Sequence, residues 1–190
     1  LSFGQGNNID GTMRIQTQLS GLGAVTRNGD GTNFVWLDPI AGNNTYSGTT
    51  IINASNSPTQ LRALNGVGLS ANSALQIGNG NGHSLFETYG DFFRPLGTTA
   101  GQVRLQSAGG FAAVGANIGV AGTGIKVGFG TDLADAQATT VTWGSANFFS
   151  GGALFRVTSA NTTANMEFVN PINLGNTGAT RQLNLAGRAN

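Results

Sequence analysis

Residues 44–54 read Asn44-Thr45-Tyr46-Ser47-Gly48-Thr49-Thr50-Ile51-Ile52-Asn53-Ala54. A β-branched run at 49–52 follows a segment that contains Asn, Ser and Gly. β-branched side chains favour extended backbone, whereas Gly and Asn accept the backbone angles of tight turns. The stretch therefore predicts a short strand that is entered through a sharp corner.

Similar short runs, many with a polar residue at every second place, are spread over the rest of the sequence. They predict strands at 33–37, 49–53, 60–64, 74–77, 102–106, 124–128, 153–158, 166–169 and 181–185. Turn residues cluster at 28–31, 78–82 and 175–178. Helical periodicity is nearly absent, and residues 133–138 are the best helix former. The chain is therefore predicted to be all-β.

The composition helps to choose between two all-β architectures, an antiparallel β-sandwich and a β-solenoid. The chain has 31 Gly, 21 Asn and 21 Thr, but only 9 Lys+Arg and 8 Asp+Glu in 190 residues. In a solenoid, like residues stack in register, so amide side chains form ladders whereas repeated charges repel. The composition favours the solenoid, with eight or nine coils if each takes about 20–25 residues. The antiparallel sandwich is the alternative.

Residues 44–54 also resemble a known sequence family, the autotransporter-associated β-strand repeat. The residues that carry the resemblance are Asn44, Thr45, Tyr46, Gly48, Thr50 and Ile52. The repeat extends over about 20–66, and the rest of the chain is similar to the segment that often follows such repeats. The resemblance implies a right-handed parallel β-helix, here a single solenoid segment over 1–190, in a secreted, surface-exposed passenger region.

Charge and composition also exclude several functions. A net charge of +1 gives no basic stripe for nucleic acid, and without Cys there is no disulfide, thiolate zinc site or thiol nucleophile. Lys126 and His83 are the single Lys and the single His, which leaves few groups for acid–base catalysis. The uncharged stretch 105–125 is rich in Gly, so no membrane span is expected. The chain is expected to be no enzyme and to need no cofactor or metal.

Three polar clusters are candidates for a metal-binding or catalytic site. The Gly-rich loop 28–31 has the oxygen ligands that suit calcium, but Asn-Gly and Asp-Gly pairs more often form turns. His83 lies near Glu87 and Asp91, so it is a candidate for a catalytic dyad or metal site, and a loop or strand-edge position is the alternative. Asp132 and Asp135 resemble paired glycosidase carboxylates, but they also suit the start of the helix-prone segment. In each case the structural interpretation is favoured.

Aromatic residues offer one further candidate site. Tyr89 and the pairs 92–93 and 148–149 would form a sugar-stacking platform if they were exposed. The favoured alternative is that they fill the interior of the solenoid.

The sequence therefore predicts a non-enzymatic extracellular structural protein, secreted or held at a cell surface. Each chain would be a β-solenoid unit that associates end to end with copies of itself into a fibre, because both ends of a solenoid are open sheet edges. The first alternative is an adhesin or carbohydrate-binding module that recognises surface glycans. A polysaccharide-cleaving β-helix is the third hypothesis.

Overall fold

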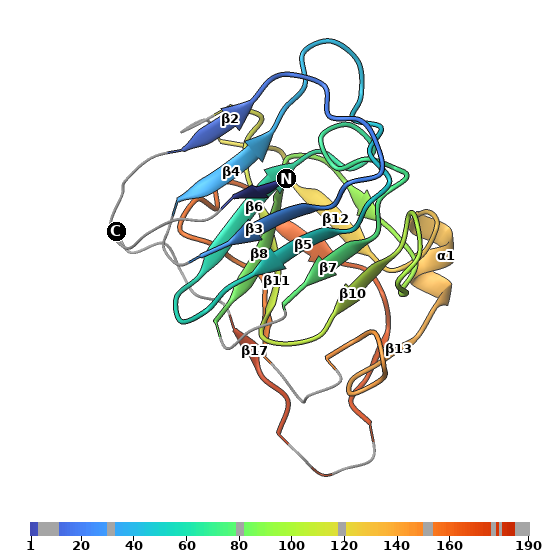
Figure 1. Cartoon of the computed structure of the whole chain (residues 1–190). Helices are drawn as coiled ribbons and strands as arrows, with labels where there is room; N and C mark the ends of the chain where they lie inside the picture. The colour runs from blue at the N-terminus through green and yellow to red at the C-terminus, as the bar shows by residue number, and fades with distance from the viewer. Residues whose placement is uncertain are drawn as a thin grey trace.

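A computed structural model describes residues 1–3, 12–29, 33–78, 82–117, 121–149, 154–175, 178 and 180–184. These residues form a parallel β-solenoid of about 6 turns with almost no helix (Figure 1). Short strands alternate with tight turns along the chain, as the sequence predicts, and strands from successive coils lie side by side.

Two large sheets form the walls of the solenoid. The seven-stranded sheet has the order β17-β14-β11-β8-β6-β4-β2, and the five-stranded sheet has the order β1-β3-β5-β7-β10. The strands of the seven-stranded sheet are β2 (Met13–Ile15), β4 (Phe34–Leu37), β6 (Thr59–Ala63), β8 (Ser84–Thr88), β11 (Gly109–Ala113), β14 (Phe155–Arg156) and β17 (Leu183–Asn184). The strands of the five-stranded sheet are β1 (Ser2–Phe3), β3 (Val25–Asn28), β5 (Thr50–Asn53), β7 (Leu75–Ile77) and β10 (Val103–Leu105).

Two smaller sheets occur in the later coils. One has the order β15-β12-β9, and the other pairs β13 with β16. Their strands are β9 (Phe92–Phe93), β12 (Ile125–Gly128), β13 (Val141–Thr142), β15 (Met166–Phe168) and β16 (Ile172–Asn173). Every pairing between the named strands is parallel, so the alternative prediction of an antiparallel sandwich is wrong.

The predicted number of coils, eight or nine, is also wrong. The early coils are 22–26 residues long, because Met13 pairs with Val35 and Val35 pairs with Leu61. A later coil is much longer, since Gly109 of β11 pairs with Phe155 of β14. That 46-residue coil contains β12, β13 and the helix α1 (Leu133–Ala138), so fewer coils fit into the chain.

The helix confirms the sequence prediction for residues 133–138. Asp132 is its N-cap, and the Asp132 side chain accepts a hydrogen bond from the Asp135 N–H at 2.9 Å. An N-cap carboxylate satisfies an amide that the first helical turn leaves without a partner. Only Ala136 of the helix is buried.

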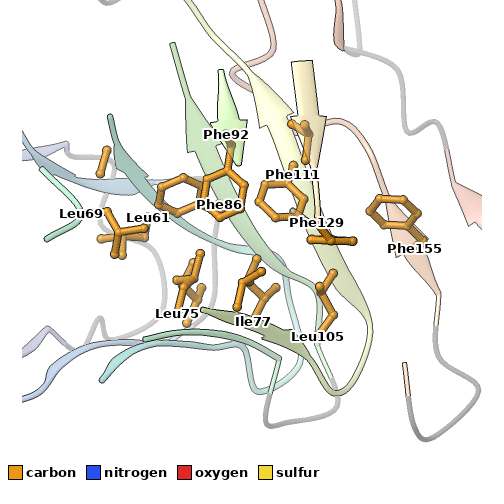
Figure 2. Close-up of a cluster of buried hydrophobic side chains, with 14 of the residues drawn as sticks. Leu61, Leu69, Leu75, Ile77, Phe86, Phe92, Leu105, Phe111, Phe129 and Phe155 are labelled. Atoms are coloured by element: carbon orange, nitrogen blue, oxygen red, sulfur yellow. The ribbon is translucent and has the colours of Figure 1, made fainter. Parts of the chain in front are cut away.

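A continuous apolar core fills the space between the sheets, and Figure 2 shows ten of its side chains labelled. Leu61, Phe86 and Phe111 occupy equivalent positions in successive strands and are completely buried. Phe92 lies 4.8 Å from Phe111 between ring centroids, and Phe111 lies 6.1 Å from Phe129. The aromatic interior therefore continues from the regular coils into the long later ones.

One pair of stacked amides occurs on the five-stranded sheet. Asn53 pairs in register with Asn28, and its side-chain amide donates to the Asn28 side chain at 3.3 Å. Asn28 in turn donates to the Ser2 hydroxyl at 3.3 Å. Two asparagines in adjacent coils satisfy one another here, as stacking in a solenoid predicts.

Candidate functional site

Asn44 lies at a corner of the solenoid and connects three successive coils. Its buried side-chain oxygen accepts from the Leu19 N–H at 2.7 Å, and its side-chain nitrogen donates to the Gly68 carbonyl at 2.7 Å. Leu19 and Gly68 belong to the preceding and following coils. Both ends of the amide are used, so Asn44 here has a structural role.

Tyr46 and Thr50 form a second buried polar group beside the same corner. The Tyr46 hydroxyl lies 2.8 Å from the Thr50 hydroxyl, which lies 2.9 Å from the Ser73 hydroxyl. Ser73 donates to the Gly48 carbonyl at 2.7 Å, so the chain of hydroxyls ends on backbone. Burial is the main cause that raises the pKa of Tyr46. The phenol therefore stays neutral and holds the corner to the next coil.

The other residues of the predicted signature contribute packing rather than reactive groups. A Cβ added to Gly48 would lie 2.4 Å from backbone atoms of Gly23 and Ala24, so only glycine fits this close approach. Ile52 is completely buried in the core, whereas the Thr45 side chain is exposed.

His83, Glu87 and Asp91 do not form a common site. The His83 Nδ1 lies 2.6 Å from the Arg156 Nη1, and the Asp91 carboxylate accepts from the Lys126 backbone N–H at 2.8 Å. Glu87 is completely buried elsewhere on β8. Within the described parts of the chain, no group of three or more His, Cys, Asp or Glu is arranged to hold a metal ion.

Glu87 is instead the centre of a buried ion pair that sequence reasoning did not find. Its Oε2 accepts from Arg62 Nε at 3.0 Å and lies 2.9 Å from Arg62 Nη2. Its Oε1 accepts from the Ser159 hydroxyl at 2.7 Å and from the Asn161 side chain at 2.8 Å. Because Arg62 is 25 residues and Asn161 is 74 residues away in sequence, no local pattern could have indicated the cluster.

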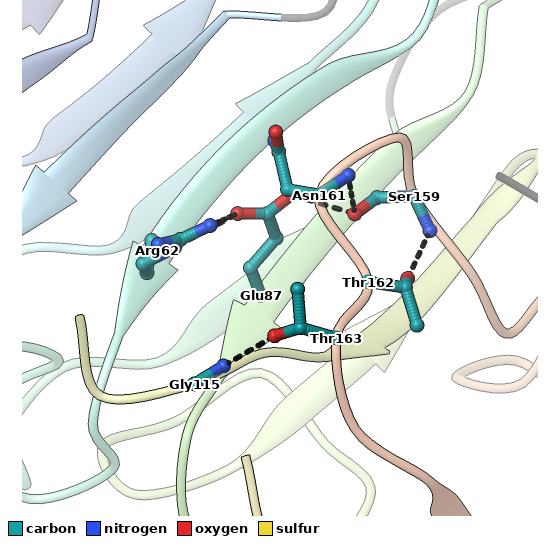
Figure 3. Close-up of polar contacts among 7 residues, drawn as sticks. All are labelled: Arg62, Glu87, Gly115, Ser159, Asn161, Thr162 and Thr163. Atoms are coloured by element: carbon teal, nitrogen blue, oxygen red, sulfur yellow. Dashed lines mark hydrogen bonds and ion pairs between the residues drawn. The ribbon is translucent and has the colours of Figure 1, made fainter. Parts of the chain in front are cut away.

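Ser159 and Asn161 belong to a segment that we call the strap, residues 157–164. Figure 3 shows the strap passing across the strands with Ser159 and Asn161 beside Glu87. Near its far end, the Thr163 hydroxyl accepts from the Gly115 N–H at 2.8 Å. Glu87 lies on the side of the seven-stranded sheet opposite to the core residue Phe86, so the strap covers the outer face.

A second buried cation, Arg94, was also missed. Arg94 donates from Nη1 to the Ser73 carbonyl at 2.5 Å and from Nη2 to the Ser70 carbonyl at 2.9 Å. Its Nε donates to the Asn65 side-chain oxygen at 2.7 Å. Burial lowers the pKa of Arg94 to about 10, so the guanidinium remains charged at neutral pH. Its bonds to uncharged oxygens connect it to the preceding coil rather than to a ligand.

The paired carboxylates and the described part of the Gly-rich loop 28–31 have structural roles. The Asp135 carboxylate accepts from the Thr131 N–H at 2.7 Å, so Asp132 and Asp135 both serve the start of α1. In the loop 28–31, Gly29 has a φ of 120°, a value typical of a glycine turn. Residues 30 and 31 lie outside the described residues.

Most of the predicted aromatic platform lies inside the solenoid. Phe92, Phe148 and Phe149 are completely buried, which confirms the interior assignment for these three. Tyr89 and Phe93 are partly exposed. The Tyr89 hydroxyl donates to the Asp38 carboxylate at 3.2 Å, and its ring packs edge-on against Trp36. The rings of Tyr89 and Phe93 lie on different elements. Most of the residues predicted to form a glycan-stacking platform are therefore buried.

The ends of the stack are the most distinctive surfaces of the molecule. Among the residues that the structure describes, β1 and β2 at one end and β17 at the other each pair on one side only. Large exposed apolar side chains concentrate in these terminal coils; they are Leu1, Met13 and Leu22 in the first coil, and Ile172, Leu174 and Leu183 in the last.

Two of these side chains occupy positions that are buried in every neighbouring coil. Met13 pairs in register with the buried Val35, yet Met13 is 53% exposed. Leu183 pairs with Phe155, which is 1% exposed, yet Leu183 is 60% exposed. Among the described residues, no further strand of this sheet lies beyond β2 or β17, and Met13 and Leu183 are exposed where their equivalents in the neighbouring coils are covered.

No helix among the described residues is both long and apolar enough to cross a membrane. Comparisons of the chain with protein-family models, with curated protein sequences and with solved structures gave no significant match.

Proposed function

We propose that this chain is a non-enzymatic structural unit of an extracellular surface fibre, in which β-solenoids associate end to end. The proposal includes the passenger-type role that the resemblance at residues 44–54 implies. The observation that carries it is the exposure of Met13 and Leu183, which occupy interior positions on the first and last described strands of the seven-stranded sheet. Burying such apolar surface stabilises association by roughly 25 cal/mol per Å² removed from water.

The polarity of the strands favours a head-to-tail arrangement. All strands of the seven-stranded sheet run parallel, so β2 of one copy would continue the ladder beyond β17 of the next. A single contact of this kind covers both apolar ends, whereas a contact between two first coils leaves the last coil exposed. A head-to-tail contact that does not close into a ring generates an open filament.

The charge pattern supports the same interpretation. A net charge of +1 produces little long-range repulsion between copies. The carboxylates weighed as catalytic groups are engaged elsewhere, since Glu87 is paired with Arg62 while Asp132 and Asp135 serve the start of α1. These arrangements support a structural role over polysaccharide cleavage.

The assembly is tested by placing a charge at each open end. Met13→Lys and Leu183→Lys should each abolish filaments seen by electron microscopy and reduce the size of particles in sedimentation velocity. Ile40→Lys is the matched control, because Ile40 is 76% exposed in a loop of the second coil. The control should assemble like the wild-type chain.

The pattern of the three variants distinguishes the possible contacts. If only Met13→Lys blocks association, the contact joins two first coils, and the head-to-tail arrangement is wrong. A wild-type chain that stays monomeric at high concentration would overturn the proposal of a fibre. Antibody labelling of intact source cells tests the extracellular location separately.

A further inference from the structure

A contact between His83 and Arg156 connects two strands that are not neighbours. His83 immediately precedes β8 and Arg156 ends β14, and β11 lies between these strands in the sheet. Arg156 pairs in register with Gly110 of β11, which has no side chain to occupy the space above it. The Arg156 Nη1 reaches across to His83 Nδ1 at 2.6 Å.

The same arginine stands at the base of the strap. Arg156 directly precedes residue 157, and its Nε donates to the Thr158 carbonyl at 3.2 Å. Farther along, Ser159 and Asn161 bond to Glu87, and Thr163 bonds to Gly115. Within the described part of the chain, the strap is held at its base, at Glu87 and beside β11. The base also includes a bond from the Val157 N–H to the Asn184 carbonyl at 3.2 Å, and of these places it alone involves a histidine.

We propose that His83 and Arg156 form a pH-sensitive catch that holds the base of the strap against the outer face of the seven-stranded sheet. In the neutral state, the His83 Nδ1 accepts a hydrogen bond from the Arg156 guanidinium. A protonated imidazole carries a hydrogen on both ring nitrogens and can accept nothing. Protonation therefore replaces a hydrogen bond with repulsion between two cations, and the base of the strap loosens.

Few other charges act on this contact among the described residues. β6 contributes Arg62 and β8 contributes Glu87, and these two are bonded to each other. β11 has no charged residue, and Arg156 is the only charged group of β14 and the strap. No described carboxylate contact offsets the repulsion between protonated His83 and Arg156.

The direction of the pH effect follows from the shift in pKa. Burial, and then the charge of Arg156, lower the pKa of His83 from its usual value of about 6.5. Below pH of about 6.5, the unfolded or undocked state binds more protons than the docked state. The contribution of the catch is therefore complete above that pH and is lost as the pH falls through the lowered pKa.

The absence of cysteine allows a direct test with a single spin label on the strap. Ala160 is exposed, so Ala160→Cys provides a labelling site that removes none of the contacts described. In the labelled wild-type background, the mobile component of the electron paramagnetic resonance spectrum should grow as the pH is lowered from 8 to 5. In a His83→Gln background it should stay small, because the glutamine oxygen accepts from Arg156 but does not titrate.

A second variant and a folding measurement complete the test. His83→Lys carries a permanent charge and should give a mobile strap at every pH, while circular dichroism shows that the β-structure persists. A wild-type spectrum that does not change with pH would overturn the proposal. So would an unchanged pH response in His83→Gln, because a group other than His83 would then be the switch.

Discussion

A single buried amide illustrates how individual residues hold this solenoid together. Asn44 uses its oxygen for the Leu19 N–H of the preceding coil and its nitrogen for the Gly68 carbonyl of the following coil. Aspartate lacks the donor, and serine is too short to offer a donor and an acceptor so far apart. A corner that must satisfy two neighbouring coils at once therefore requires an amide.

Gly48 provides the sharpest prediction at the scale of single residues. Gly48→Ala should destabilise the fold by about 3 kcal/mol, at the upper end of the usual cost of overpacking, because the new Cβ would meet backbone at 2.4 Å. Gly23→Ala is the matched control, since a Cβ there has no neighbour within 4 Å. Urea unfolding of both variants measures the difference. Equal stabilities would show that the two corners are farther apart than described.

In one column on the outer face of the seven-stranded sheet, the charged side chains are arranged so that like charges are not adjacent. One column of register positions on its outer face reads Arg14, Trp36, Arg62 and Glu87 in successive strands. The Arg14 guanidinium lies 4.2 Å from the centre of the Trp36 ring, and Arg62 is bonded to Glu87. An aromatic ring thus separates the two arginines, so no position has a like charge directly above or below it.

Because the strap covers Glu87, the stability of the fold should depend strongly on the charge of this residue. Glu87→Gln should destabilise the chain by roughly 3–5 kcal/mol, because it leaves the Arg62 guanidinium buried without its anion. Chemical denaturation measures the loss. The double variant Arg62→Met, Glu87→Leu should recover most of the stability, since it removes both buried charges together.

An exposed ion pair on the same sheet serves as the control. Arg14 is bonded to Asp38 with side chains that are 40% and 17% exposed. Asp38→Asn should cost less than about 1 kcal/mol, as is usual for pairs in contact with water. If Asp38→Asn and Glu87→Gln had equal effects, Glu87 would not be buried as described.

Some strands and the helix could be predicted from the sequence, whereas other strands and the number of coils could not. The strand at 49–53 and the helix at 133–138 were predictable because turn residues and helix formers mark them locally. β8 was missed: its outward-facing Glu87 is buried by contacts with Arg62 and with the strap, which returns from 72 residues later, and no local pattern reveals these contacts. The number of coils was overestimated for a related reason: no local signal shows that a 46-residue coil follows coils of 22–26 residues.

At the scale of the whole molecule, the scarcity of charge and the open ends have a common consequence. A solenoid grows by adding parallel strands to an edge, and nothing in a strand edge limits that growth. Here Leu183 at the last coil and Met13 at the first coil expose apolar side chains at such edges. With a net charge of +1, electrostatic repulsion does little to oppose the addition of a further copy.

Head-to-tail assembly predicts a specific diffraction pattern for aligned filaments. Successive strands of a sheet are about 4.8 Å apart, so the strands should give a reflection at that spacing along the filament axis. Each copy contributes the seven strands of its largest sheet, which corresponds to an axial repeat of about 34 Å if the ladder continues across the contact. Fibre diffraction and the layer lines of electron micrographs measure both spacings. A strand reflection perpendicular to the axis would mean that the copies associate side by side, and an axial repeat near twice 34 Å would indicate alternating orientations, which contradicts a head-to-tail stack.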